Sequence, residues 1–349
     1  MLTTPLARKL RVEIPIFSAP MGGGTAGPAL SAAVSNAGGC GILGLGGVPA
    51  LAVPELIRAT RTATERPFGA GLLLPFLDPA AFEACLAERL PFLVLFWGEL
   101  TPWVGHAHRR GIRVFAQVGS VAEARAAARA GADAVIAQGF EAGGHVRGTT
   151  SLGALLPAVV AAVKPLPVLA AGGIATGAGL AAALAAGAQG AMLGTRFLAS
   201  PEASATDEYK RRIVAANAED TVHTTLFGVG WPDAPHRVLR NRAVAEWEAA
   251  GSPAPGARPG EGTAIGKVRL GSGLVEVPRY SVMSPFASFE GDHELAALYA
   301  GESCSLVHDL RPAARIVREV AREAERALAR LAPRAAQQRP PRRSRGRAR

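Results

Sequence analysis

Short apolar segments alternate with Ala-rich segments through the first two hundred residues. Each apolar segment ends in glycine or a polar residue, and the next segment has its apolar positions at helical spacing, as in residues 120–131. Strands separated by helices pair in parallel, and eight such units predict a (β/α)₈ TIM barrel of the α/β class, whereas a doubly wound open sheet seldom needs eight even repeats. The predicted strands are 14–21, 41–47, 68–74, 92–98, 113–119, 133–139, 167–173 and 190–195.

The repeat is lost after Asn217. Loop signals and one helix occupy 227–247, a Pro/Gly-rich loop follows, and 266–286 has no regular pattern. Residues 294–328 predict a helix, a turn and a long amphipathic helix. We therefore expect a barrel over 1–220, a smaller cap or substrate domain over 221–300, a C-terminal helix within 301–333 that packs on the barrel, and a basic tail over 334–349.

The formal net charge of +10 overstates the basic character of the folded part. Six arginines lie within 339–349, so the rest of the chain carries only +4. A Pro/Arg/Ser segment cannot bury apolar surface, and we expect the tail to be disordered. A solvated tail is favoured over one that contacts nucleic acid or acidic partners. The body has no basic stripe interleaved with aromatic residues, so specific nucleic-acid binding is not predicted.

Cysteine usage favours a reducing compartment, and we expect a cytoplasmic protein. Cys40, Cys85 and Cys304 have no CxxC spacing, which argues against a disulfide framework or a zinc site. Residues 1–17 lack the apolar core of a secretory signal. Residues 165–194 carry no charge and are long enough to cross a membrane, but their glycines divide them into strand, helix and strand. A membrane location is therefore not predicted.

Glycines follow the last two predicted barrel strands, where TIM barrels commonly bind a phosphate group. Gly172 and Gly173 follow the seventh strand, and Gly194 and Thr195 follow the eighth. Glycine allows backbone N–H groups to approach an anion closely, and a following helix adds a favourable dipole. We expect the phosphate of a cofactor or substrate there. The glycines in 18–24, after the first strand, permit a flat ligand to lie close, although a tight turn would also explain them.

The segment "QGFEAGGHVRG", residues 138–148, follows the sixth strand at the same end of the barrel. Gly143 and Gly144 allow the backbone to pass beside a ligand and to present His145 inward. An imidazole with a pKa near neutrality is a suitable general base or proton donor. A structural histidine is the alternative. Metal binding is not indicated, because no second histidine or carboxylate stands at ligand spacing.

These motifs resemble the nitronate monooxygenase family. The resemblance rests on "QGFEAGGHVRG", on "APMGGG" upstream, on "VLAAGGI" and "GAMLGTRFLAS" downstream, and on the closing "AGESCSLVHDLRPAARIVREV". It covers most of the chain. Flavin-dependent enoyl-acyl-carrier-protein reductases and some NAD(P)H:quinone reductases resemble this chain at the "EAGGH" motif too. The motif is therefore specific to a superfamily rather than to one reaction.

The resemblance implies FMN bound without a covalent link on the barrel, with His145 in the catalytic position. It places Pro20, Met21 and Gly22 against the isoalloxazine ring, Gln138, Gly143 and Gly144 beside the flavin or its ribityl chain, and Gly172, Gly173, Met192, Leu193, Gly194 and Thr195 around the phosphate. Gly71 is a departure, because the family often has an asparagine there that contacts the flavin. "MLGT" replaces the more usual "QMGT", so that contact is expected to be made by the backbone alone.

The implied reaction is the FMN-dependent oxidation of alkyl nitronates by O₂ to a carbonyl compound and nitrite. His145 would remove the α-proton of a neutral nitroalkane or stabilise a bound nitronate anion. An NAD(P)H-dependent flavin reductase acting on a quinone or an enoyl thioester is the alternative, although no GxGxxG motif indicates a separate nucleotide site. A flavin- or phosphate-binding protein without catalytic activity is disfavoured by the His145 loop. The oligomeric state is left open.

Overall fold

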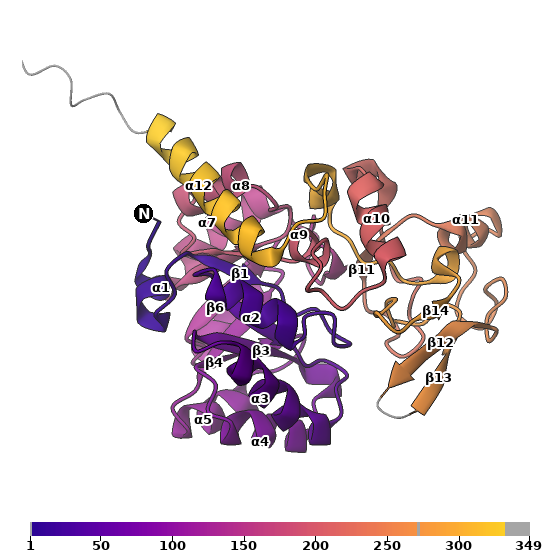
Figure 1. Ribbon diagram of the computed structural model, residues 1–349, viewed down its shortest axis with the longest axis horizontal. Helices are drawn as coiled ribbons and strands as arrows, with labels where there is room; N and C mark the ends of the chain where they lie inside the picture. The colour runs from indigo at the N-terminus through magenta and orange to yellow at the C-terminus, as the bar shows by residue number, and fades with distance from the viewer. Residues whose placement is uncertain (1, 271–272, 332–349) are drawn as a thin grey trace, which may run out of the picture.

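The computed structural model describes residues 2–270 and 273–331, and its main body is a barrel of eight parallel strands (Figure 1). A bridge between Phe17 and Cys40 joins the first and last strands of the order β1-β9-β8-β6-β5-β4-β3-β2 and closes the barrel. All eight predicted strands and the TIM-barrel class are confirmed. The strands are β1 Ile16–Ser18, β2 Gly41–Gly44, β3 Phe68–Leu73, β4 Phe92–Phe96, β5 Arg113–Val118, β6 Ala134–Gln138, β8 Val168–Ala171 and β9 Ala191–Leu193.

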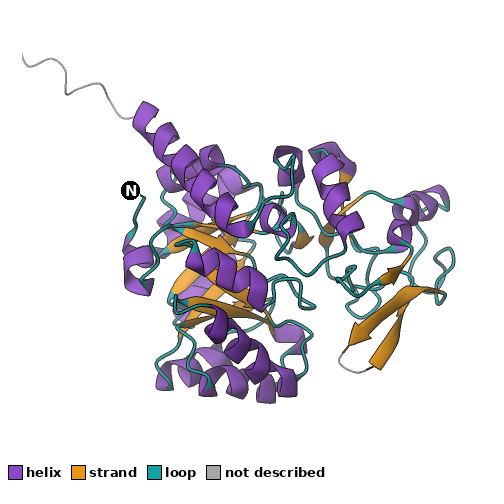
Figure 2. Ribbon diagram, in the orientation of Figure 1, coloured by secondary structure: helices purple, strands orange, loops and turns teal. Residues whose placement is uncertain are grey.

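Helices surround the strands (Figure 2). They are α2 Pro28–Asn36, α3 Val53–Ala63, α4 Pro79–Ala87, α5 Thr101–Arg109, α6 Val121–Arg129, α7 Leu152–Val163, α8 Gly177–Ala185 and α9 Thr195–Leu198. Helix α12, Ala313–Leu331, packs against α8 and α2 on the outside of the barrel. Residues 165–194 form β8, α8 and β9 as predicted, and no helix among the described residues is long and apolar enough to span a bilayer.

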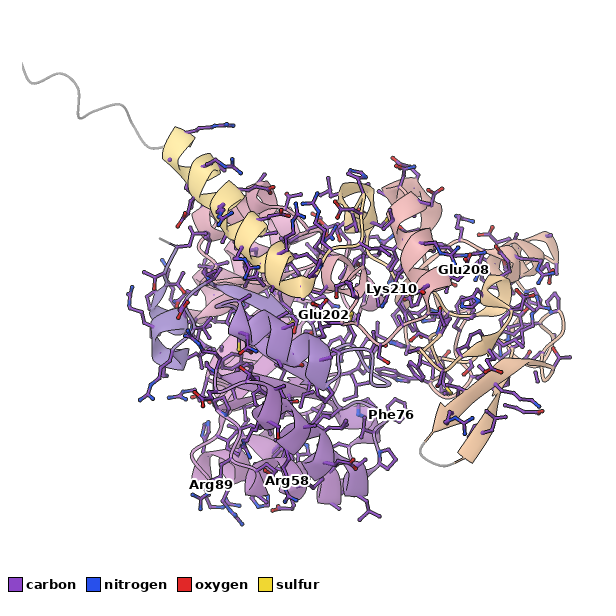
Figure 3. The ribbon with its side chains drawn as sticks, viewed as in Figure 1. Arg58, Phe76, Arg89, Glu202, Glu208 and Lys210 are labelled. Carbon is purple, nitrogen blue, oxygen red and sulfur yellow. The ribbon has the colours of Figure 1, made fainter. Side chains whose placement is uncertain are left out.

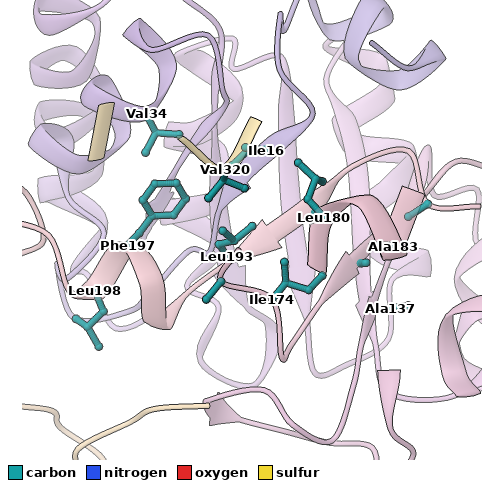
Figure 4. Packing of buried hydrophobic residues seen from close by; sticks show 14 of the residues in the cluster. Ile16, Val34, Ala137, Ile174, Leu180, Ala183, Leu193, Phe197, Leu198 and Val320 are labelled. Carbon is teal, nitrogen blue, oxygen red and sulfur yellow. The ribbon is translucent and has the colours of Figure 1, made fainter. Parts of the chain in front are cut away.

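Two apolar layers hold the barrel together. Inside the barrel, the rings of Phe92 and Phe115 stack with their centroids 4.5 Å apart. Leu6 and Leu10 of helix α1, Pro5–Leu10, belong to the same apolar cluster. Between strands and helices lies a second apolar layer, part of which is drawn in Figure 4, and its many alanines allow close packing. This arrangement fills the barrel interior and leaves the loops at the carboxyl ends of the strands to form a site.

Residues 207–300 form a smaller unit beside the barrel (Figure 1). Its two antiparallel sheets have the orders β10-β11-β7 and β13-β12-β14. Strand β7, Gly144–His145, belongs to the loop after β6, so its pairing with β11 ties this unit to the barrel. The other helices and strands of this unit are α10 Asp207–Ala215, β10 Thr221–Thr224, β11 His236–Leu239, α11 Arg242–Ala249, β12 Ala264–Leu270, β13 Gly273–Pro278 and β14 Glu290–Gly291. Its 3₁₀ turns are η3 Ala218–Asp220 and η4 His293–Leu295, and those outside it are η1 Ala50–Ala52, η2 Leu74–Phe76 and η5 Glu302–Leu306.

Two sequence-based expectations for this unit are wrong. Residues 266–286, expected to be irregular, contain most of the hairpin β12–β13. Residues 296–300, expected to be helical, are extended: Leu239 N–H donates to the Leu298 carbonyl at 2.8 Å, and Tyr299 bridges to Val238. Pairing with β11 satisfies this backbone and overrides its helical preference. The predicted tail at 334–349 lies outside the described residues.

Candidate active site

A cavity of about 530 Å³ lies at the carboxyl ends of the barrel strands, a volume within the usual range for small-molecule and cofactor sites. Its walls come from the loops after the strands and from the smaller unit beside the barrel. That unit contributes Trp231, Phe286 and Tyr299 among others. The position agrees with the general placement of active sites in TIM barrels.

Thirteen of the predicted site residues line this cavity, and one does not. Those that line it are Pro20, Met21, Gly22, Gly71, Gln138, Gly143, Gly144, His145, Gly172, Gly173, Met192, Gly194 and Thr195. Leu193 is fully buried in the layer between barrel and helices (Figure 4). Because successive strand residues face opposite sides, Met192 points into the barrel and Leu193 points out of it. The Leu193 side chain therefore does not face the cavity, and the expected contact of Leu193 with a ligand stays a prediction for its backbone.

The two glycine pairs form a cradle suited to an anion. Gly172 and Gly173 have φ values of 97° and 68°, a left-handed conformation that other residues rarely adopt. The N–H groups of Gly172, Gly173 and Gly194 donate to no backbone acceptor within the described residues. The Thr195 hydroxyl accepts a hydrogen bond from Gly301 N–H at 3.0 Å, which leaves its own proton available. Unpaired N–H groups at one point of a loop attract phosphate oxygens.

Close backbone approach explains two other glycines at the site. A Cβ at Gly71 would lie 2.3 Å from the Pro20 ring, so any larger residue at this position would require Pro20 to shift. A Cβ at Gly143 would lie 2.3 Å from the Gly301 nitrogen. The segment around Gly301 therefore packs directly on the loop that carries His145.

The charged residues of the 138–148 loop anchor it rather than line the cavity. Both carboxylate oxygens of Glu141 accept from Leu152 N–H at the start of α7, at 3.0 and 2.9 Å. Arg147 pairs with Glu123 at 2.9 Å on the outside and lies over the Trp97 ring. With these two anchors in place, the loop turns His145 inward.

His145 lies among aromatic rings. Its imidazole stacks on Trp231 with ring centroids 4.2 Å apart, and the rings of His236 and Tyr299 lie at 5.3 and 5.5 Å. The Nε2 atom is buried and has no hydrogen-bond partner among the described residues. Burial, reinforced by His236, lowers the pKa of His145 to about 3. The expectation of a near-neutral pKa is therefore wrong, and the imidazole is uncharged at pH 7.

Gln138 connects this histidine to the barrel. Its Nε2 donates to the His145 carbonyl at 3.0 Å, which fixes the start of the turn. Its Oε1 is buried and has no partner among the described residues. A buried acceptor of this kind is costly unless a ligand donor satisfies it.

Sequence reasoning missed His236, which no motif distinguishes. Its Nδ1–H donates to the Ala234 carbonyl at 2.8 Å, and its Nε2 accepts from Phe227 N–H at 3.3 Å. Both bonds require the neutral ring with its proton on Nδ1. Burial lowers the pKa of His236 to about 4. The residue thereby presents an uncharged edge to His145.

The buried Tyr209, the partly buried Tyr299 and an arginine were missed as well. Tyr299 donates to the Val282 carbonyl at 2.8 Å, and Tyr209 donates to the Tyr299 carbonyl at 2.6 Å. Arg237 donates to the Phe140 carbonyl at 3.0 Å and pairs with Glu302 at 3.1 Å. The bond from Arg237 to Phe140 attaches the smaller unit to the His145 loop, and the two tyrosine bonds hold that unit together.

We expect His236 to make folding stability depend on pH. The unfolded ring has a pKa near 6.5 and the folded ring one near 4, so the contribution is complete above pH 6.5 and is lost as the pH falls toward 4. Between pH 7.5 and 5.0 the loss is about 2 kcal/mol at 1.36 kcal/mol per pH unit. Urea unfolding gives the free energy of unfolding at pH 7.5 and at pH 5.0. The difference between these two free energies should be smaller by this amount in His236→Gln than in the unmodified protein. An unchanged difference would contradict the assignment.

A family model for nitronate monooxygenase matches residues 3–97 and 98–323. The chain belongs to the nitronate monooxygenase family. A nitronate monooxygenase of Paraburkholderia phytofirmans is 32% identical over 370 residues, covering 92% of this chain and 95% of that protein. A nitroalkane oxidase structure from Streptomyces ansochromogenes superposes with a TM-score of 0.72 at 29% identity, covering 93% of this chain and 99% of that one.

Another relative carries a different name. A hydroxy-methyl-oxo-octahydro-indene-carboxyl-CoA dehydrogenase of Rhodococcus jostii is 36% identical over 253 residues, covering 72% of this chain and 69% of that protein. Membership in the nitronate monooxygenase family makes the protein an oxidoreductase that acts on a small molecule with O₂, and it implies a flavin cofactor. The glycine cradle and the unsatisfied Gln138 oxygen fit such a cofactor.

Proposed function

We propose that the protein catalyses the FMN-dependent oxidation of alkyl nitronates and nitroalkanes by O₂ to a carbonyl compound and nitrite. The observation that carries the proposal is the placement of His145 in one cavity with the glycine cradle. Family membership supports the reaction class, and the geometry supports the division of roles.

The proposed cofactor contacts follow the walls of the cavity. Gly172, Gly173, Gly194 and Thr195 hold the phosphate, while Pro20, Met21 and Gly22 lie against the flavin ring. Gln138, Gly143 and Gly144 hold the ring edge or the ribityl chain, and Gly71 lets Pro20 approach. When bound, FMN supplies the electron acceptor for the substrate and the donor to O₂. A cradle for one phosphate, with no second such cradle among the described residues that line the cavity, favours FMN over FAD.

His145 acts on the substrate in its uncharged form. Its Nε2, which has no hydrogen-bond partner among the described residues, would accept the α-proton of a nitroalkane and leave the resulting anion beside an imidazolium. That opposite charge raises the pKa of His145 and offsets the lowering by burial. If a preformed nitronate binds instead, the neutral ring with its proton on Nε2 donates to a nitro oxygen.

The surrounding rings set the orientation of His145. Trp231 stacks on one face of the imidazole, and Gln138 holds the backbone of the same residue. Tyr299 and His236 fill the remaining sides without presenting a charge. The shell excludes water and strengthens the electrostatic interaction between the imidazole and the developing anion.

The cofactor proposal is tested with purified protein. We expect a flavin absorption band and release of FMN, not FAD, on denaturation. A colourless protein that cannot be reconstituted with FMN, or one that releases FAD, would contradict it.

An NAD(P)H-dependent reductase acting on an enoyl thioester or a quinone is the second candidate. The name of the Rhodococcus jostii relative, a carboxyl-CoA dehydrogenase, supports a thioester as the substrate of this second candidate reaction. The same cavity and cofactor would serve that reaction, so the two candidates differ in the donor that reduces the flavin.

A further inference from the structure

The cavity has no charged wall. Among the described residues that line it there is no Asp, Glu, Lys or Arg. His145 is neutral, and the other polar groups are amides, hydroxyls and backbone atoms. A carboxylate or phosphate on the substrate would therefore have no cationic partner outside the glycine cradle, and burying an unpaired anion is costly.

Buried cations near the cavity are committed elsewhere. Arg237 is paired with Glu302 and bonded to the Phe140 carbonyl. The Lys210 ammonium donates to the Pro201 carbonyl at 3.4 Å, and burial lowers its pKa. Neither lines the cavity, although Tyr209, next to Lys210, does. Neither of these two cations therefore supplies the positive charge that the cavity wall lacks.

An aromatic path leads from His145 toward the surface. The Trp231 ring that stacks on His145 also meets Phe76 edge-to-face, with centroids 5.0 Å apart. Both residues line the cavity, but Trp231 is 7% exposed and Phe76 is 48% exposed. Phe76 belongs to η2, on the side of the barrel that faces the smaller unit (Figure 3). Trp231 is therefore the inner part of this path and Phe76 the outer part.

We propose that this site selects nitro compounds whose remaining substituent is an uncharged alkyl or aryl group, and that Phe76 and Trp231 are its specificity-determining wall. The inference rests on the proposed function. With the nitro-bearing carbon beside His145, the substituent extends along Trp231 toward Phe76. Aromatic side chains contribute large apolar contact area in a fixed geometry, and uncharged chains gain by contacting them.

A matched ligand pair tests the charge selection. 3-Nitropropionate and 3-methyl-1-nitrobutane have nearly the same shape and differ in a terminal carboxylate. Anaerobic isothermal titration of the flavin-loaded protein should give a dissociation constant at least about 100-fold higher for 3-nitropropionate. Equal affinities, or tighter binding of the carboxylate, would overturn the inference. Because this is a binding measurement, it remains decisive even if neither compound is turned over.

A chain-length series tests the wall. From nitroethane to 1-nitrohexane, affinity should rise by up to about fourfold for each added methylene, the factor that full burial would give. In Phe76→Ala, the ratio of affinities for 1-nitrohexane over nitroethane should fall by about tenfold, the worth of one aromatic contact. Leu51→Ala is the matched control, because Leu51 is 96% exposed on a neighbouring barrel loop and does not line the cavity.

The outcomes separate the two levels of the proposal. An unchanged ratio in Phe76→Ala, or an equal fall in Leu51→Ala, would remove Phe76 from the specificity wall. Tight, chain-length-dependent binding with no turnover of any nitro compound would contradict the nitronate reaction and leave the selection for uncharged substituents standing. Turnover of nitro compounds with no preference among substituents would contradict the selection for uncharged substituents and leave the nitronate reaction standing.

Discussion

Replacing His145 with asparagine should lower turnover of neutral nitroalkanes by about 10²–10⁴-fold, the usual contribution of a positioned general base. Turnover of preformed nitronates should fall much less, because their α-proton is already gone. Flavin content should stay near normal, since the proposed phosphate contacts lie on the loops after β8 and β9. Steady-state rates on both substrate forms at one pH measure the effect.

His223→Asn is the matched control for this experiment. His223 lies on β10 and does not line the cavity, so the same substitution should leave both rates near those of the unmodified protein. An equal loss on both substrate forms in His145→Asn would show that His145 orients the anion rather than moving a proton. No loss on either form would make it a structural residue of the loop.

Gly173→Asp should strongly weaken flavin binding. The new carboxylate would stand in the cradle proposed for the phosphate, and like charges about 4 Å apart at an effective dielectric of 20 repel by about 4 kcal/mol, or roughly a thousandfold in affinity. Nothing within 3.6 Å prevents a Cβ at this position, so the charge rather than a clash should dominate. Titration of the flavin-free protein with FMN gives the dissociation constants.

Gly173→Asn separates charge from backbone strain. Asparagine has nearly the same shape as aspartate and tolerates the φ of 68° about as well, but it is neutral. We expect Gly173→Asn to bind FMN far more tightly than Gly173→Asp. Similar affinities for the two variants would show that backbone strain, not the phosphate, explains the loss.

The barrel could be predicted because its signal is local and repeated. Each strand is a short apolar run followed by glycine or a polar residue, and the whole strand order follows once parallel pairing is assumed. The position of the glycine cradle could be predicted for a related reason. In this fold, glycines after the last two strands are brought together by topology, and no long-range contact has to be known.

The smaller unit was predicted poorly because long-range contacts determine it. Residues 296–300 have a helical pattern but pair with β11, and this pairing delivers Tyr299 to the cavity. Trp231 and His236 lie in a segment dominated by loop signals, and only the folded chain places them against His145. The neutral state of His145 was missed for the same reason, since its pKa is set by burial among these distant residues.

Anaerobic mixing of the purified, flavin-loaded protein with an alkyl nitronate or with NADPH distinguishes nitronate oxidation from NAD(P)H-dependent reduction. We expect the nitronate alone to bleach the flavin absorbance within the turnover time and NADPH to leave it unchanged. Admitting O₂ should then restore the colour with release of nitrite. Bleaching by NADPH but not by the nitronate would contradict nitronate oxidation and would assign the protein to the reductases of its superfamily.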